Sequence, residues 1–488
     1  MTDLKKSMGG IAGTFMALSA VLGSGMMILP GVSYHQLGKS AWIPWAIAAV
    51  SVIPLLSCYA WLGRRYPSAS GIAYYAEVAL GPAVGRTVGI IATIGLVAAV
   101  PATALTGGRY VAQFLGIGAA AQVFPIVVLA GGTIVAYLGA NVSSKLQVAL
   151  IIGLFALVTC IAVVALAVHG FAPPNLALPA HGDLGGVLTA VYVAFVGWET
   201  VAFTFEEHKR SDLIPRIFAA SFAIVVVLYA LLLLGLFATV DPADGRLDSA
   251  PLVLLAERAL GSLARPVMLI VVIACITANV FAAALALSRL VFGLARSGYL
   301  PAKLSRVRER DRNPVAAVLV VGATLTLIAT LGASGLFSFE VLFSVTGGLY
   351  FVLYGIGVAA FARLAKGIKA RVITVVSAIT VAAVTLIAGP SMWWSWAAFL
   401  VVLLGVVALG RRTSKTADAE TIQFNVAALR AAEQETVQFN VAGLRTADRE
   451  TLQFDVGWLR GADAPTLEFP TINLGPRPKK AREHATHP

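Results

Sequence analysis

The chain has 488 residues, of which 58% are hydrophobic and 12% are charged, with a mean hydropathy of +0.85 and a formal net charge of +12. Soluble globular domains carry roughly 25% charged residues, so the composition excludes that class. The apolar runs are longer than the ~10-residue alternating segments of a membrane barrel. We therefore expect an all-α polytopic membrane protein, because lipid admits only helices and closed barrels.

Twelve apolar windows have roughly the 20-residue length that crosses a bilayer. They lie at 10–33, 41–63, 84–107, 122–140, 147–168, 185–206, 216–239, 266–294, 314–333, 338–362, 371–389 and 392–410. The segment 71–82 is amphipathic and too short to cross, which predicts a helix on the membrane surface. Basic residues before the tail gather on the side that holds both termini, so the positive-inside rule predicts cytoplasmic termini. The positive charge therefore indicates no nucleic-acid partner.

Two windows are interrupted in their apolar run. The first contains Gly23-Ser24-Gly25, and the sixth contains Gly197 and the carboxylate of Glu199. Breaks at corresponding positions of two oppositely oriented halves predict an inverted-repeat transporter with its binding site between them. Freed N–H groups suit a carboxylate and freed carbonyls an ammonium, which together fit a zwitterionic amino acid. The alternative for the first interruption is close helix packing through small residues.

Glu199 is the carboxylate placed well inside a window. Ionisable groups at membrane depth are costly and usually functional. Two roles are open for it: proton binding during transport, or a fixed anchor that accepts hydrogen bonds from the broken backbone. The anchor role is favoured.

Four motifs stand in order over residues 10–410. They are Gly23-Ser24-Gly25-Met26 with Leu29-Pro30, the segment 62–75, Phe195-Val196-Gly197-Trp198-Glu199 followed by Glu206-Glu207, and Ser288-Arg289 followed by 295–301. With these motifs the chain resembles the amino acid–polyamine–organocation family of secondary transporters. The resemblance implies 12 transmembrane helices, a five-plus-five inverted repeat with broken helices 1 and 6, two extra helices, and alternating access.

The resemblance also implies a substrate site. Its members are the amides of Ser24, Gly25 and Met26, the carbonyls of Val21, Val193 and Val196, the break glycines Gly23 and Gly197, and the aromatic Phe195 and Trp198. Two departures from the family bear on function. Val193 stands where some members carry an aromatic gate, and 148–168 lacks the lysine that replaces a coupling cation in others.

The expected pocket is apolar and carries no charge besides Glu199. Besides site residues, we expect Met27, Ile276 and Phe281 near it. This favours a neutral, hydrophobic amino acid, and Val100-Pro101-Ala102 is similar to the methionine/branched-chain amino acid exporter branch. We expect secondary active export across a bacterial cytoplasmic membrane, with proton coupling as one possibility. The alternatives are uptake by proton symport and a non-transporting sensor. No enzyme activity, cofactor or metal site is expected.

After the transporter domain at 1–411, the segment 412–488 predicts a disordered cytoplasmic tail. A repeat with a period of fifteen residues occupies 421–430, 436–445, 451–460 and, degenerately, 466–474. Acidic residues precede Thr421, Thr436 and Thr451, an arrangement similar to acceptor sites of membrane Ser/Thr kinases that forkhead-associated domains read after phosphorylation. The alternatives are an unselected spacer and a short β-segment with Ile422, Phe424 and Val426 on one face.

Overall fold

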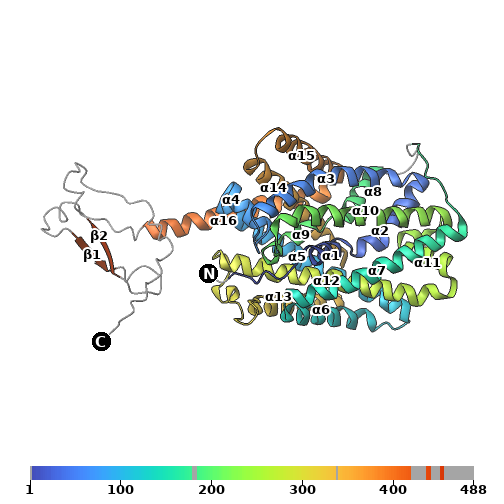
Figure 1. The fold of residues 1–488 in the computed structure, drawn as a ribbon, viewed down its shortest axis with the longest axis horizontal. Helices are drawn as coiled ribbons and strands as arrows, with labels where there is room; N and C mark the ends of the chain where they lie inside the picture. The colour runs from blue at the N-terminus through green and yellow to red at the C-terminus, as the bar shows by residue number, and fades with distance from the viewer. Residues whose placement is uncertain (1–2, 178–183, 337–338, 419–435, 441–450, 456–488) are drawn as a thin grey trace, which may run out of the picture. The chain divides into compact units, whose positions relative to one another are not determined.

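A computed structural model describes residues 3–177, 184–336, 339–418, 436–440 and 451–455. The chain divides into two compact units, residues 1–408 and residues 409–488. The first unit is a bundle of helices that run side by side (Figure 1).

The first half of the bundle begins with a discontinuous pair of helices. The helices in this half are α1 (Gly10–Val21), α2 (Ser24–Leu37), α3 (Trp42–Arg65), α4 (Ile72–Leu80), α5 (Pro82–Leu115), α6 (Ala120–Leu138) and α7 (Ala140–His169). The axes of α1 and α2 differ by 53°. Short 3-10 turn η1 (Gly38–Ser40) joins α2 to α3.

A second discontinuous pair opens the other half. The α-helices are α8 (Leu184–Ala194), α9 (Trp198–Ala202), α10 (Ile214–Thr239), α11 (Pro251–Leu260), α12 (Ala264–Arg296), α13 (Val315–Ala333), α14 (Phe339–Leu364), α15 (Ile368–Ala388) and α16 (Pro390–Asp418). The 3-10 turns are η2 (Phe205–Glu207), η3 (Ser211–Leu213), η4 (Gly245–Asp248), η5 (Gly261–Leu263) and η6 (Ala302–Ser305).

Each of the twelve expected windows coincides with a helix or a broken pair, and the short segment 71–82 forms α4. In the described part of the chain, ten helices are long and apolar enough to cross a membrane, or eleven if α1 and α2 count as one. The twelfth window falls in α16, whose apolar part Met392–Ala408 is shorter. The prediction of twelve crossings therefore stays a prediction.

The broken helices lie among the long helices of the bundle. α1 packs against α7, α10 and α12, while α2 packs against α8 and α10. The apolar windows of α5, α14 and the α11–α12 stretch are mostly buried inside the protein. The bundle thus holds both breaks within its interior, with α12 alongside the first one.

In the second unit, two copies of the repeat form paired strands. β1 (Thr436–Asn440) and β2 (Thr451–Asp455) are antiparallel, with Thr436 opposite Asp455 and Asn440 opposite Thr451. Within the tail, which the sequence predicts to be disordered, backbone pairing satisfies the N–H and C=O groups of these two segments. Thr421 and the repeat copies 421–430 and 466–474 lie outside the described residues.

Candidate functional site

The first break separates α1 from α2 at Leu22 and Gly23. Gly23 is extended (φ −128°, ψ −151°) and ends the helical hydrogen bonding that began at Gly10. Side chains from α12 meet the carbonyls freed there. Asn279 Nδ2 donates to the carbonyls of Ser19 (2.9 Å) and Ala20 (3.0 Å).

The thiol of Cys275, one helical turn from Asn279, covers the next carbonyls. Its Sγ lies 3.7 Å from the carbonyl oxygen of Leu22 and 3.6 Å from that of Gly23. Among the described contacts, the carbonyls of this stretch are therefore covered by α12 on both sides of Val21. The Val21 carbonyl is the acceptor that α12 leaves available.

The amino end of α2 points its N–H groups into the break. Its N-cap residue, Gly23, makes no side-chain capping hydrogen bond, while the N–H of Met26 donates to the Gly23 carbonyl at 3.2 Å. The first N–H groups of a helix have no partner within the helix, and the helix dipole makes this end positive. The amides of Ser24 and Gly25 thus belong to an end suited to a carboxylate, and Met26 has a partner already.

The second break lies between Ala194 and Trp198, and Gly197 meets the first break there. Its φ of +121° is a left-handed conformation that favours glycine. A Cβ at this position would lie 2.7 Å from the carbonyl oxygen of Ala20 and 3.2 Å from the Cα of Val21. Gly197 therefore allows the two broken helices to touch at their breaks.

The carbonyls of the second break are partly used within the chain. The Val193 carbonyl accepts the N–H of Val196 at 3.2 Å, and the Ala194 carbonyl accepts the hydroxyl of Tyr229 at 3.3 Å. Val193 as a residue is 43% exposed. Val196 is half-buried, as are Gly23 and Gly25 on the other side of the contact.

The two aromatic residues expected in the pocket pack toward α3 and α10. The Phe195 ring centroid lies 5.9 Å from that of Trp45 and 5.8 Å from that of Tyr229. Trp198 is fully buried, with its centroid 5.5 Å from that of Phe218. Both rings contribute to an aromatic cluster that packs the second break against α3 and α10.

Three further residues expected near the pocket are buried. Ile276 lies against Gly107 of α5, and Phe281 lies against Gly132 of α6. Met27 is buried in α2. Ile276 and Phe281 therefore line the contacts of α12 with α5 and α6.

Glu199 is fully buried at the start of α9. Its Oε2 accepts the N–H of Gly197 at 3.1 Å, and its Oε1 accepts the hydroxyl of Thr200 at 3.2 Å. None of the ion pairs in the described residues involves Glu199. Its carboxylate is thus bound to the broken backbone itself.

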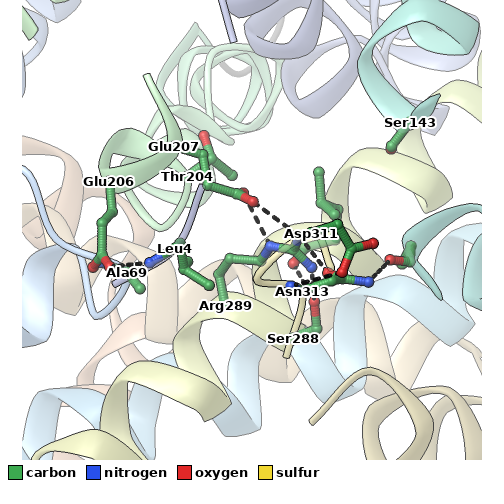
Figure 2. Close-up of polar contacts among 12 residues, drawn as sticks. Leu4, Ala69, Ser143, Thr204, Glu206, Glu207, Ser288, Arg289, Asp311 and Asn313 are labelled. Atoms are coloured by element: carbon green, nitrogen blue, oxygen red, sulfur yellow. Dashed lines mark hydrogen bonds and ion pairs between the residues drawn. The ribbon is translucent and has the colours of Figure 1, made fainter. Parts of the chain in front are cut away.

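The end of the bundle that carries residues 3–9 holds a buried ion-pair network. Arg289 of α12 donates to both carboxylate oxygens of Glu207 at 3.0 Å, and its side chain is 1% exposed. Figure 2 shows Arg289 at the centre of this network, also donating to Ser288 and Asn313. Asn313 in turn donates to the carbonyls of Ala136 and Tyr137 at 2.9 Å each, which ties the end of α6 to the network.

A second pair lies two helical turns along α12. Arg296 donates to the two carboxylate oxygens of Glu206 at 2.7 and 2.5 Å. Glu206 also accepts the backbone N–H groups of Leu4 and Ala69, as Figure 2 shows. Burial by itself raises the pKa of Glu206. The hydrogen bonds and the positive charge of Arg296, together with the hydrogen bonds from the amides of Leu4 and Ala69, outweigh burial, so the pKa lies below its ordinary value. We call the two pairs, with Ser288 and Asn313, the N-face network.

The amino-terminal segment closes over this network. Ser7 and Met8 donate their N–H groups to the Glu207 carbonyl at 2.9 and 3.0 Å, and Lys209 donates to the Met8 carbonyl at 2.9 Å. His208 lies beneath it, 3% exposed, against Gly13 of α1. Burial lowers the pKa of His208 to about 4.

Sequence reasoning named the motif residues of the N-face network without assigning them a role, and it missed Asn279 and Asn313. A lone amide in an otherwise apolar span such as α12 is the signal that points to Asn279, because a buried amide needs a partner. Thr436 and Thr451, the expected phosphorylation sites within the described residues, begin β1 and β2.

A bundle of membrane helices in which two discontinuous helices meet at their breaks defines a secondary transporter. The sequence matches the amino acid permease family over residues 9–417. The chain therefore belongs to that family, whose members are transporters rather than enzymes.

Three bacterial relatives and one solved structure illustrate the match. The uncharacterized amino acid permease YecA of Bacillus subtilis is 28% identical over 70% of this chain and 80% of its own length. The L-methionine/branched-chain amino acid exporter YjeH of Escherichia coli is 28% identical over 43% and 51%. The branched-chain amino acid permease BcaP of B. subtilis is 23% identical over 67% and 75%. The structure of MhsT with L-phenylalanine shares the fold, with a TM-score of 0.55 and 13% identity over 83% of this chain and 99% of MhsT.

Proposed function

We propose that the protein is a secondary active transporter that exports neutral, hydrophobic amino acids, in the range of methionine and the branched-chain amino acids, by alternating access. The observation that carries this proposal is the contact between the two breaks. The uncapped amino end of α2 offers N–H groups there. The Cα of Val21 lies 3.2 Å from the position of a Cβ at Gly197, and the carbonyl of Val21, which α12 leaves available, is the proposed acceptor. An amino acid zwitterion would place its carboxylate on the N–H groups of α2 and its ammonium on the Val21 carbonyl.

The substrate side chain is proposed to be uncharged. Glu199 is engaged by Gly197 and Thr200. The other residues at the breaks, 21–26 and 193–198, carry no charged side chain. A cationic or anionic side chain would lose hydration there without gaining an opposite charge. Two relatives, the methionine/branched-chain amino acid exporter YjeH and the branched-chain amino acid permease BcaP, are named for the same substrate class.

Glu199 is proposed as a structural anchor of the second break. A buried carboxylate that holds the amide of Gly197 and the hydroxyl of Thr200 fixes the turn that α9 needs. Proton coupling through this group is the competing role. A Glu199→Gln variant separates them, because an amide retains an acceptor for Gly197 but carries no titrating proton.

Both termini and the N-face network are proposed to face the cytoplasm of a bacterial cell, on the strength of the basic loops of that side. The export direction is proposed because YjeH is named an exporter. BcaP is named a permease, which leaves uptake as the alternative. A non-transporting sensor that signals through the repeat tail, as a substrate of a Ser/Thr kinase and a ligand of a forkhead-associated domain, is the other alternative.

Flux measured in reconstituted liposomes tests the proposal. We expect movement of radiolabelled methionine and leucine, but not of arginine or glutamate, and sensitivity to a proton gradient if protons are coupled. Movement of arginine or glutamate would refute the pocket assignment. Binding without movement of any of the four would favour the sensor. The Gly153→Ala variant is a suitable control, because Gly153 has open space around its Cα.

A further inference from the structure

Asn279 is a polar side chain of α12 that the proposed substrate contacts do not use. Its amide nitrogen has two protons, and both are accounted for by the carbonyls of Ser19 and Ala20 at 2.9 and 3.0 Å. These two hydrogen bonds fix the orientation of the amide. They place a donor group directly on the carboxyl-terminal end of α1, where the helix stops.

Carbonyls at such an end are an electronegative site. The end of a helix carries roughly half a negative charge, and unwound carbonyls in discontinuous membrane helices coordinate cations in many transporters. A cation at this end of α1 would need oxygen ligands from the facing helix as well. Here α12 presents the amide protons of Asn279 and, one turn away, the thiol of Cys275. Toward these carbonyls, α12 therefore directs the amide protons of Asn279 and the thiol of Cys275, where a cation would require acceptors.

We propose that Asn279 is a positioning residue that takes the place of a bound inorganic cation at the first break, joining α1 to α12 so that the protein works without Na⁺. Gly23 makes room for this arrangement. A Cβ at Gly23 would lie 3.2 Å from Nδ2 and 3.4 Å from Cγ of Asn279. The break glycine and the amide thus form one unit, in which the small residue admits the donor that neutralises the carbonyls.

The thermal stability of the purified full-length protein tests this inference independently of transport. We compare the wild type with Asn279→Asp, Asn279→Ala and Cys275→Ala in sodium, potassium and choline chloride of equal ionic strength at mildly alkaline pH. The wild type is expected to melt at the same temperature in all three salts. Asn279→Asp replaces the donor with a carboxylate beside the two carbonyls, so it is expected to require a cation and to melt several degrees higher in sodium than in choline.

The two alanine variants separate positioning from simple packing. Asn279→Ala is expected to melt lower than the wild type in every salt, because the carbonyls of Ser19 and Ala20 lose their partner. Cys275→Ala removes a weak sulfur contact and is expected to melt within a degree or two of the wild type. A wild-type protein stabilised by sodium, or an Asn279→Asp variant that melts equally in all salts, would overturn the inference.

The consequence for transport rests on the proposed function. In liposomes, wild-type flux of methionine is expected to be equal in sodium and choline. The methionine flux of Asn279→Asp is expected to be roughly tenfold higher in sodium than in choline, because a factor of this size corresponds to the loss of a pair of hydrogen bonds. Wild-type flux that requires sodium would overturn the inference. Absence of wild-type flux for every amino acid would refute the proposed function alone, since the melting experiment still decides the role of Asn279.

Discussion

Gly197 is the residue on which the contact of the two breaks depends most directly. Its φ of +121° costs a side-chain-bearing residue of the order of 1–3 kcal/mol. The backbone of Ala20, 2.7 Å from the position of a Cβ, has no room to move aside because Asn279 holds the same carbonyl. Backbone strain and a steric clash therefore act at one position.

We predict that Gly197→Ala lowers the affinity for methionine at least tenfold and lowers the melting temperature. Isothermal titration and thermal unfolding of the purified protein measure the two effects. The control is Gly153→Ala in α7, where a Cβ meets open space and helix propensity favours alanine by about 1 kcal/mol. Equal affinities of the two variants would show that the breaks do not need to touch for binding.

His208 makes the closure of the N-terminal segment depend on pH. Its pKa is lowered by burial to about 4 from 6.5, so the closed form holds it neutral and an open form takes up a proton below pH 6.5. The stability of the closed form is therefore complete above that value and falls as the pH drops toward 4. At pH 5.5 the loss amounts to about 1 kcal/mol. Glu206, whose pKa lies below its ordinary value, loses its contribution only at lower pH.

We predict faster hydrogen exchange at the amides of Ser7, Met8 and Lys209 at pH 5.5 than at pH 7.5, after correction for intrinsic exchange. His208→Gln is expected to remove this difference, because glutamine does not titrate. His169→Gln, at the end of α7, serves as the control and is expected to retain it. Protection that stays the same at both pH values in the wild type would contradict the buried neutral state of His208.

At the scale of elements, α12 connects the first break with the N-face network. Asn279 contacts the break and Arg289 the network. Ten residues of helix separate them, about 15 Å along the axis. Movement of α1 away from α12 must break the hydrogen bonds of Asn279 with the carbonyls of α1. Opening of the amino-terminal face must break the ion pairs of the N-face network at the other end of α12.

We predict that the single variants Arg289→Leu and Glu207→Leu each lower stability by about 3–5 kcal/mol, because each leaves one charge buried without a partner. The double variant is expected to lose less than the sum. A double-mutant cycle on unfolding free energies in detergent measures this coupling. The exposed pair Arg246–Glu257 at 3.2 Å, with side chains 58% and 48% exposed, is the control and is expected to couple by less than about 1 kcal/mol. Additive effects for Arg289 and Glu207 would contradict their pairing.

The strands of the tail respond differently to phosphate at their two threonines. Thr436 stands opposite Asp455, whereas Thr451 stands opposite Asn440. Like charges at opposed positions of a strand pair destabilise it by roughly 0.2–1 kcal/mol. We predict that phosphorylation at Thr436 increases hydrogen exchange in β1 and β2 more than phosphorylation at Thr451. Asp455→Asn in the full chain is expected to abolish the difference, and an equal response of the two sites in the wild type would contradict the register.

At the scale of the whole molecule, the basic loops and the N-face network define one side of the membrane. We predict that a membrane-impermeant maleimide labels Ala243→Cys, in the exposed turn after α10, in intact bacterial cells, and labels Ala302→Cys only after lysis. Both variants are made in a background without the three native cysteines. The reverse pattern would place the N-face network outside the cell and contradict the proposed orientation.

Much of this architecture was predictable from the chain itself. Span positions follow from apolar runs long enough to cross a bilayer, and the two breaks follow from Gly23 and Gly197, because a membrane helix tolerates such residues only where the backbone lines a cavity or a helix contact. The side-chain partners were not predictable in the same way. Phe195 and Trp198 read as pocket residues by position, yet their rings pack toward Trp45 and Phe218.

The sequence by itself determined that the protein is a helical membrane transporter with two interrupted spans, since hydropathy and backbone conformation are properties of short segments. Only the tertiary structure decided which groups meet across the chain. It joined Glu207 to Arg289 and Asn279 to the carbonyls of α1, contacts separated by 82 and 260 residues. It also paired two tail repeats as strands. Such pairings depend on helix rotation, crossing and strand register, which no local pattern of residues specifies.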